Sequence, residues 1–228
     1  MRILFFGDSV TYGHGLPDCI TRRDNWEEDW RNLKPSQLGW ASIVSNNLRV
    51  ECVNLAFPGA SNMEIHWRIR GYQDYNLDDI IVVQWSYPNR DAILGERLTQ
   101  IGPWTENNQR DHYFMAHDLI DMTRRSMLII EHTALWLSHH GFKWIFLAND
   151  RLSIQSHIDD LILGYSNDYF VDYAEDMLHP GIEANKRWAV VVEEHLRELL
   201  ENDEVDLKTL IPDSVSTNEF LHKQRERI

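Results

Sequence analysis

The 228-residue sequence is poor in cysteine, in long apolar runs and in basic residues. Its two cysteines, Cys19 and Cys52, form neither a disulfide framework nor a cluster with metal-ligand spacing. No apolar stretch approaches the roughly 20 residues that a membrane-spanning helix needs, which excludes an integral helical membrane protein. The chain enters an apolar run directly, without the pattern of a cleaved leader, so we expect a cytoplasmic protein.

The shortage of basic residues excludes a second group of functions. Lysine and arginine together number 22 against 36 aspartates and glutamates, for a net charge of −14 and a pI near 5.1. Such a chain is repelled by a nucleic-acid backbone or an anionic membrane, and we expect neither as a partner. With 43% hydrophobic residues, 228 residues are enough to bury the core of one domain.

A short apolar run, residues 3–6, is typical of a strand that is buried on both faces. It ends at Gly7, and Asp8 and Ser9 follow at once. Residues there lie at the carboxyl edge of a sheet, where open α/β folds bind their ligands. Ser9 is therefore a candidate nucleophile, and the amides of Ser9 and Val10 are candidate donors to an anion. By itself, Gly-Asp-Ser is also a common turn in which Asp or Ser caps a helix.

A carboxylate and an imidazole stand three residues apart near the other end, at Asp176 and His179. A serine hydroxyl needs a base to take its proton, and that base needs a group that fixes its tautomer. Ser9, His179 and Asp176 supply these three roles if the fold brings the two ends together. Asp8 and Asp172 compete with Asp176 as orienting groups, although we expect Asp8 to cap the turn that follows it.

The Gly-Asp-Ser motif at residues 7–9 and the Asp-x-x-His-Pro motif at residues 176–180 together resemble the SGNH (GDSL-like) hydrolase family. The resemblance spans about residues 2–200. It implies a flavodoxin-like three-layer α/β/α domain with a mostly parallel, five-stranded sheet. It also implies ester hydrolysis through Ser9, His179 and Asp176, without a metal or an organic cofactor.

The same resemblance points to an oxyanion hole with further donors. Gly59 matches the glycine of the second family block, whose amide joins that of Ser9, although a plain Pro-Gly turn is the alternative. The third block departs from the family pattern, because Trp-Ser-Tyr-Pro-Asn-Arg stands where Gly-x-Asn-Asp is usual. Asn89 is the candidate third donor, with Ser86 or Arg90 as alternatives. Asn89 is also what a simple turn after a proline would contain.

Apolar patterning predicts alternating strands and helices over residues 1–200. The expected strands are residues 3–6, 50–55, 79–85, 142–148 and 169–172, and the expected helices are residues 39–48, 63–72, 117–140 and 182–200. Two insertions, at about 16–38 and 91–112, leave the active edge, and we expect them to meet over Ser9. We interpret residues 149–151 as loop caps, and residues 201–228 as a C-terminal extension.

We therefore predict a serine ester hydrolase (an esterase, acetylesterase or lipase-like enzyme) that forms an acyl-enzyme. Its partner would be a small-molecule or carbohydrate ester, and the oligomeric state stays open. The alternative is a catalytically weak or inactive binding or structural protein on the same fold, possibly for carbohydrate, which the altered third block favours. A flavodoxin-like nucleotide binder is a third interpretation, but the sequence lacks a phosphate-loop pattern.

Overall fold

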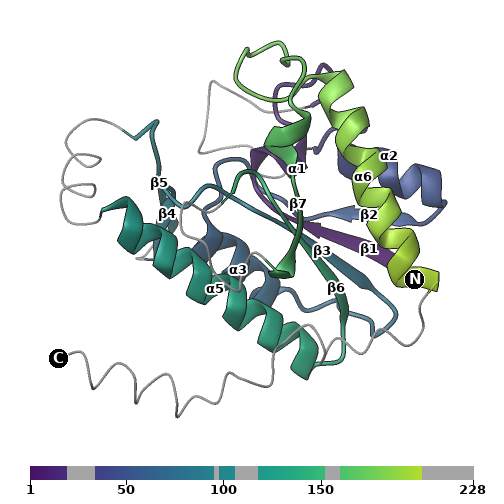
Figure 1. The fold of residues 1–228 in the computed structure, drawn as a ribbon, viewed down its shortest axis with the longest axis horizontal. Coiled ribbons are helices and arrows are strands. Elements are labelled where there is room, and N and C mark those ends of the chain that lie inside the picture. Colours follow the sequence, from purple (N-terminus) through teal and green to yellow (C-terminus); the bar gives the residue numbers. More distant parts are fainter. Residues whose placement is uncertain (20–33, 95–97, 106–117, 152–159, 202–228) are drawn as a thin grey trace.

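A parallel sheet forms the centre of the computed structural model, which describes residues 1–19, 34–94, 98–105, 118–151 and 160–201. The sheet has five strands in the order β2-β1-β3-β6-β7, all paired in parallel (Figure 1). They are β1 (Arg2–Phe6), β2 (Glu51–Asn54), β3 (Ile80–Trp85), β6 (Lys143–Ala148) and β7 (Ile162–Tyr165). An antiparallel hairpin of β4 (Asp91–Leu94) and β5 (Leu98–Ile101) stands apart from this sheet.

Helices cover both faces of the sheet. On one face lie α2 (Trp40–Leu48) and α6 (Ile182–Glu201), and on the other α3 (Asn62–Gly71) and α5 (Leu119–His139) (Figure 1). Two short elements, α1 (Ser9–Tyr12) and the 3-10 helix η3 (Ser166–Tyr169), follow β1 and β7. This three-layer arrangement confirms the predicted α/β fold class.

The continuous apolar runs of the central strands follow from burial on both faces. Leu4 and Phe6 of β1 pack into the core beneath α3 and α5, whereas Ile3 and Phe5 pack into the core beneath α2 and α6. All six residues of β3 are buried. Because side chains alternate along a strand, a strand between two helical layers carries apolar residues at nearly every position.

Helix ends agree closely with the sequence prediction. The carboxylate of Asp118 accepts a hydrogen bond from the Asp121 amide (2.7 Å) and begins α5. Gly141 follows that helix with a φ of 74°, the left-handed conformation expected for a residue that ends a helix. The expected helix over residues 117–140 is thus present as Leu119–His139.

The predicted fifth strand was wrong. Residues 169–172 are not a strand, and the edge of the sheet is formed by β7, at residues 162–165. The Asp172 carboxylate instead accepts the amides of Glu183 (3.0 Å) and Ala184 (2.7 Å), in the first turn of α6. This is the role of a helix-capping aspartate, which fits a loop before α6 and not a strand. Because both oxygens of the Asp172 carboxylate bind these amides, Asp172 does not orient His179.

The insertions are described only in part. Residues 20–33 of the first lie outside the described ranges, so the expectation that both insertions meet over Ser9 is not tested. The second contains the β4–β5 hairpin. Of the C-terminal extension, residues 202–228 also lie outside the described ranges. Within those ranges, no helix has both the length and the apolar character needed to cross a bilayer.

Candidate active site

The turn after β1 places Ser9 at the carboxyl edge of the sheet. Asp8 is the N-cap of α1, and its Oδ1 accepts the Val10 amide (2.9 Å). Gly7 has no room for a side chain, because a Cβ there would lie 2.2 Å from Thr11 Oγ1 and 3.1 Å from the Gln84 carbonyl. Ser9 itself is 4% exposed. The expectation that Asp8 caps this turn is confirmed.

A second turn lies beside the first. The Phe57 amide donates to the Gly7 carbonyl (3.0 Å), which joins the turn containing Gly59 to the nucleophile turn. Gly59 has a φ of 80°, a conformation that glycine adopts without strain. Among the described residues, the amides of Ser9 and Gly59 have no hydrogen-bond acceptor. The amide of Val10, which we also considered as an anion donor, is already occupied by Asp8.

The motif near the C-terminus forms a hydrogen-bonded pair. His179 Nδ1 lies 2.6 Å from Asp176 Oδ2, and Asp176 Oδ1 accepts the amides of Leu178 (3.0 Å) and His179 (3.1 Å). Burial alone would raise the pKa of Asp176, but these hydrogen bonds outweigh it and hold the pKa below its usual value. An ionised carboxylate only accepts, so Nδ1 carries the proton and Nε2 is left as an acceptor.

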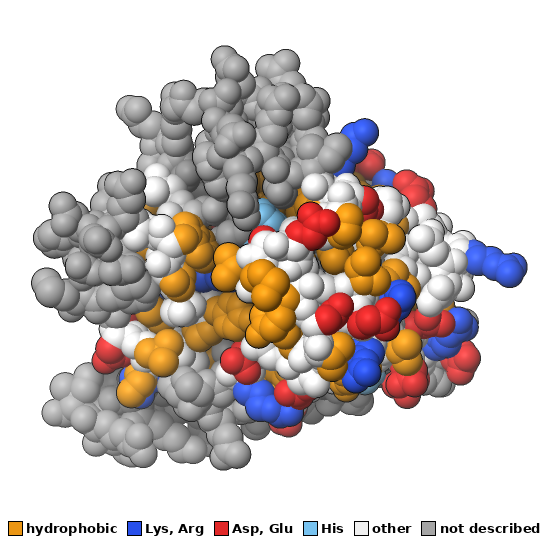
Figure 2. Space-filling view, turned by 90° about the horizontal axis from the view of Figure 1, so that it is seen from above, with side chains coloured by type: hydrophobic (Ala, Val, Ile, Leu, Met, Phe, Trp, Pro, Cys, Tyr) orange, Lys and Arg blue, Asp and Glu red, His pale blue; other side chains and the backbone are white. Residues whose placement is uncertain are grey.

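Two contacts bring this pair against the segment that follows the nucleophile turn. Gly15, with a φ of 84°, lies so close to Asp176 that a Cβ would be 2.6 Å from Asp176 Oδ2. The His14 amide donates to the Ser9 carbonyl (2.9 Å), and the His14 ring stacks on the His179 ring with centroids 4.7 Å apart. The segment that follows Ser9 therefore lies against the Asp176–His179 pair. Figure 2, which looks at the molecule from above relative to Figure 1, shows some histidine surface recessed beside hydrophobic side chains.

The carboxylate of Asp8 is the centre of a network that the sequence did not reveal. Asp8 is fully buried, and its Oδ2 accepts Ser86 Oγ (2.7 Å), Arg90 Nη1 (2.6 Å) and Asn149 Nδ2 (2.7 Å). These donors follow β3 and β6, so the ends of three neighbouring strands meet at one carboxylate. The interpretation of Asn149 as a loop cap was wrong, since its side chain reaches Asp8 across the sheet.

A second layer of polar groups orients Asn149. Gln84 Nε2 donates to Asn149 Oδ1 (2.6 Å) and to Ser166 Oγ (2.9 Å). Gln84 Oε1 accepts Thr11 Oγ1 (3.2 Å) on the first helix. Gln84 is the one polar side chain in an otherwise apolar buried strand, which is the signal that could have indicated this network.

The three candidates for the third oxyanion donor, in the altered third block, have different surroundings. Ser86 and Arg90 both donate to Asp8, which occupies the Ser86 hydroxyl and one Arg90 nitrogen. Arg90 also lies over the rings of Tyr87 and Trp104, 5.0 Å from each centroid. Asn89 is half-buried in the turn closed by the Arg90 amide and the Tyr87 carbonyl (3.3 Å). Its side chain has no hydrogen-bond partner within the described part of the chain.

His14, Asp176 and His179 are also the described side chains most suited to hold a metal ion, with ligand atoms within 4.8 Å of one another. Two features oppose that use. The histidine rings stack with only 24° between their planes, so their nitrogen lone pairs do not converge on one point. His179 Nδ1 and Asp176 Oδ2 already share a hydrogen bond that a cation would have to break.

The low pKa of Asp176 predicts how its contribution to stability varies with pH. Because the folded pKa lies below the unfolded one, the contribution is complete above about pH 4 and is lost as pH falls through the folded pKa. The melting temperature of Asp176→Asn should therefore lie below that of wild type at pH 7, and the gap should narrow as the pH falls below about 4. Thermal melts across this range measure it. A gap that does not change with pH would contradict the prediction.

Comparisons with known proteins find similarity in the fold of the chain and not in its sequence. No protein-family model and no curated protein sequence matches the chain. Among solved structures, it is similar to a G-D-S-L family protein from Desulfitobacterium hafniense DCB-2 (TM-score 0.50, 11% identity, 85% of this chain and 98% of that one). It is also similar to TesA (TM-score 0.53, 13% identity, 87% and 99%).

A third similar structure is a carbohydrate esterase family 2 enzyme with a carbohydrate-binding domain, from Corynascus thermopiles (TM-score 0.53, 12% identity, 88% of this chain and 66% of that one). Identities of this size carry the fold and leave the substrate open. The chain therefore has the fold of the SGNH (GDSL-like) hydrolases.

Proposed function

We propose that the chain is a serine ester hydrolase in which Ser9 is the nucleophile, His179 the general base and Asp176 the group that orients it. The observation that carries the proposal is the 2.6 Å contact of His179 Nδ1 with Asp176, in a loop that packs on the segment following Ser9. That contact leaves Nε2 to take a proton.

In the first half-reaction, Ser9 Oγ attacks the ester carbonyl carbon while its proton passes to His179 Nε2. The amides of Ser9 and Gly59 donate to the carbonyl oxygen as it becomes an oxyanion, each worth about 3 kcal/mol of barrier in a well-aligned site. The bond between the acyl carbon and the leaving oxygen then breaks, and His179 returns the proton to that oxygen. The alcohol leaves, and Ser9 carries the acyl group.

In the second half-reaction, water replaces the alcohol. His179 takes a proton from water, the resulting hydroxide attacks the acyl carbon, and Ser9 leaves with the proton from His179. Asp176 stabilises the imidazolium of both steps. The proposal covers the reaction class and names neither the acyl group nor the alcohol of the substrate. A panel of acetyl, short-acyl, carbohydrate and thioester substrates tests that reaction class. A wild-type chain that hydrolyses none of them would favour the alternative, a binding protein on this fold.

Asn89 is the proposed third oxyanion donor. Asn89→Ala should lower kcat by roughly 100-fold and leave KM nearly unchanged, because the oxyanion exists mainly in the transition state. Turnover and melting temperature measured on one preparation separate the two roles of the residue. A small loss of kcat with a lower melting temperature would mean that Asn89 only shapes the turn, and that the hole consists of two backbone amides.

A further inference from the structure

The peptide group between Pro58 and Gly59 is held from the side opposite to its N–H. Gln100, on β5, donates from Nε2 to the carbonyl oxygen of Pro58 (3.2 Å). In a trans peptide, the carbonyl of one residue and the amide of the next point in opposite directions within one plane. No cis peptide occurs among the described residues. A hydrogen bond to the Pro58 oxygen therefore also fixes the direction of the Gly59 N–H.

The Gln100 amide is itself held in place. Its Nε2 also donates to Glu64 Oε2 (2.8 Å), so both of its N–H groups are used. Both partners only accept hydrogen bonds, which requires the nitrogen of the Gln100 amide to face them. The Gln100 oxygen then lies over Gly59, 2.6 Å from the position that a Cβ would occupy. Glycine is the residue that permits this approach.

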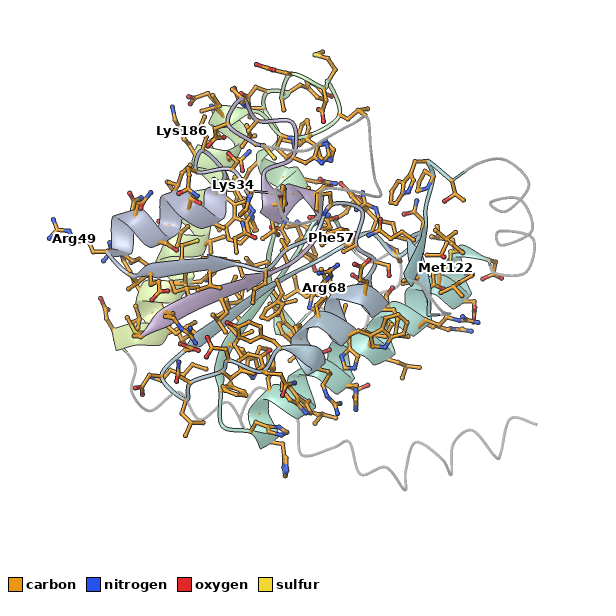
Figure 3. The ribbon with its side chains drawn as sticks, turned by 180° about the vertical axis from the view of Figure 1, so that it is seen from behind. Lys34, Arg49, Phe57, Arg68, Met122 and Lys186 are labelled. Carbon is orange, nitrogen blue, oxygen red and sulfur yellow. The ribbon has the colours of Figure 1, made fainter. Side chains whose placement is uncertain are left out.

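Glu64, the second partner of Gln100, is itself held by a partly buried ion pair with Arg68. Glu64 is 1% exposed, and its Oε1 accepts Arg68 Nε (2.9 Å) and Nη2 (2.6 Å). The Arg68 guanidinium lies 4.2 Å from the centre of the Phe57 ring, at the start of the turn that contains Gly59. Figure 3 shows Phe57 and Arg68 directed toward one another between the sheet and α3. The turn is thus held by two contacts: Arg68 packs on Phe57, and Gln100 donates to Pro58. Glu64 binds both Arg68 and Gln100.

We propose that Gln100 is a positioning residue for the oxyanion hole: it fixes and polarises the peptide whose N–H, at Gly59, stabilises the transition state. This inference rests on the proposed function. A hydrogen bond accepted by the carbonyl of a peptide strengthens the donor at its other end. The β4–β5 hairpin, which follows the altered third block, thereby supports the second block.

Gln100→Met tests the proposal, because methionine keeps the length of the side chain and removes both hydrogen bonds. We expect kcat to fall about tenfold, less than for loss of a donor, with KM nearly unchanged. Thr99→Ala is the matched control, since Thr99 is an exposed neighbour on the same strand. Unchanged kcat in Gln100→Met, or a loss that matches its unfolded fraction at the assay temperature, would overturn the proposal.

Gln100→Glu gives a second and pH-dependent test. It places a carboxylate against Glu64, so the two groups repel unless one is protonated, and only the protonated form can donate. Relative to wild type, its kcat should therefore recover as pH falls. A ratio of kcat values that does not vary with pH would count against the proposal.

The amide resonance of Gly59 supplies a readout that needs no catalysis. Gln100→Met should shift this resonance in a ¹⁵N–¹H spectrum and leave Gly141, after α5, unchanged. A Gly59 resonance that does not move would overturn the inference even if the chain hydrolyses no ester. A wild type without activity, together with a Gly59 shift, would instead refute the proposed function and keep the placement of the peptide.

Discussion

Ser9→Ala should abolish covalent labelling by a fluorophosphonate probe and lower ester turnover by about 10⁴-fold or more. In this reaction the serine oxygen attacks the phosphorus atom of the probe and fluoride leaves. No other group proposed in the site can replace that oxygen. The variant should fold normally, because it removes one hydroxyl and keeps the Asp8 cap of α1. Labelling intensity, turnover and melting temperature measured on the same preparation test the assignment.

Two further variants define what the labelling means. Ser45→Ala removes another buried serine hydroxyl, on α2, and should label as wild type does. His179→Ala keeps Ser9 and should label far more slowly, since the hydroxyl then has no base. Undiminished labelling of Ser9→Ala would refute the nucleophile. Slow labelling of the wild type, equal to that of His179→Ala, would favour the binding-protein alternative.

Arg90→Met should lower the free energy of unfolding by about 3–5 kcal/mol, because it leaves the Asp8 carboxylate buried without its charged partner. Asp8 is 0% exposed and the Arg90 side chain 13% exposed, and their contact is 2.6 Å. We also expect the position of Ser9 to change, since the other oxygen of Asp8 accepts the Val10 amide in the first turn of α1. Urea unfolding measures the stability, and the labelling rate measures the effect on Ser9.

The chain offers a matched control for this pair. Arg151 binds Asp168 at 2.9 Å and lies over the Tyr165 ring at 4.6 Å, but its side chain is 67% exposed. Arg151→Met should therefore cost less than about 1 kcal/mol. If both substitutions lowered the free energy of unfolding equally, the burial of the Arg90–Asp8 pair would not explain its contribution to stability.

A double-mutant cycle isolates the interaction itself. Asp8→Asn combined with Arg90→Met removes both charges, so the double variant should be more stable than the sum of the single losses predicts. A coupling of about 2–3 kcal/mol is expected for a buried pair of this kind. Additive losses would mean that Arg90 stabilises the fold through its packing on Tyr87 and Trp104 and not through its charge.

Local patterns in the sequence were sufficient to predict most of the secondary structure and the pairing of Asp176 with His179. Apolar runs predicted β1, β3 and β6, because a strand buried on both faces is apolar at most positions. Asp176 and His179 are three residues apart, so one turn of backbone brings them together whatever the rest of the fold does. Both kinds of signal lie within a few residues, which is the range over which a sequence pattern is informative.

The contacts that support the site join residues that lie far apart in the sequence. Asn149 meets Asp8 across 141 positions, Arg90 meets it across 82, and Gln100 reaches Pro58 across 42. No periodicity records such contacts, since they depend on which strands become neighbours and on where each strand ends. The error at residues 169–172 has the same origin, because only the placement of α6 gives Asp172 helix amides to bind. Patterns along the chain were thus enough to predict the fold class, whereas the partners of Asp8, Asn149 and Gln100 follow from packing, since burial and long-range contacts are properties of the folded chain.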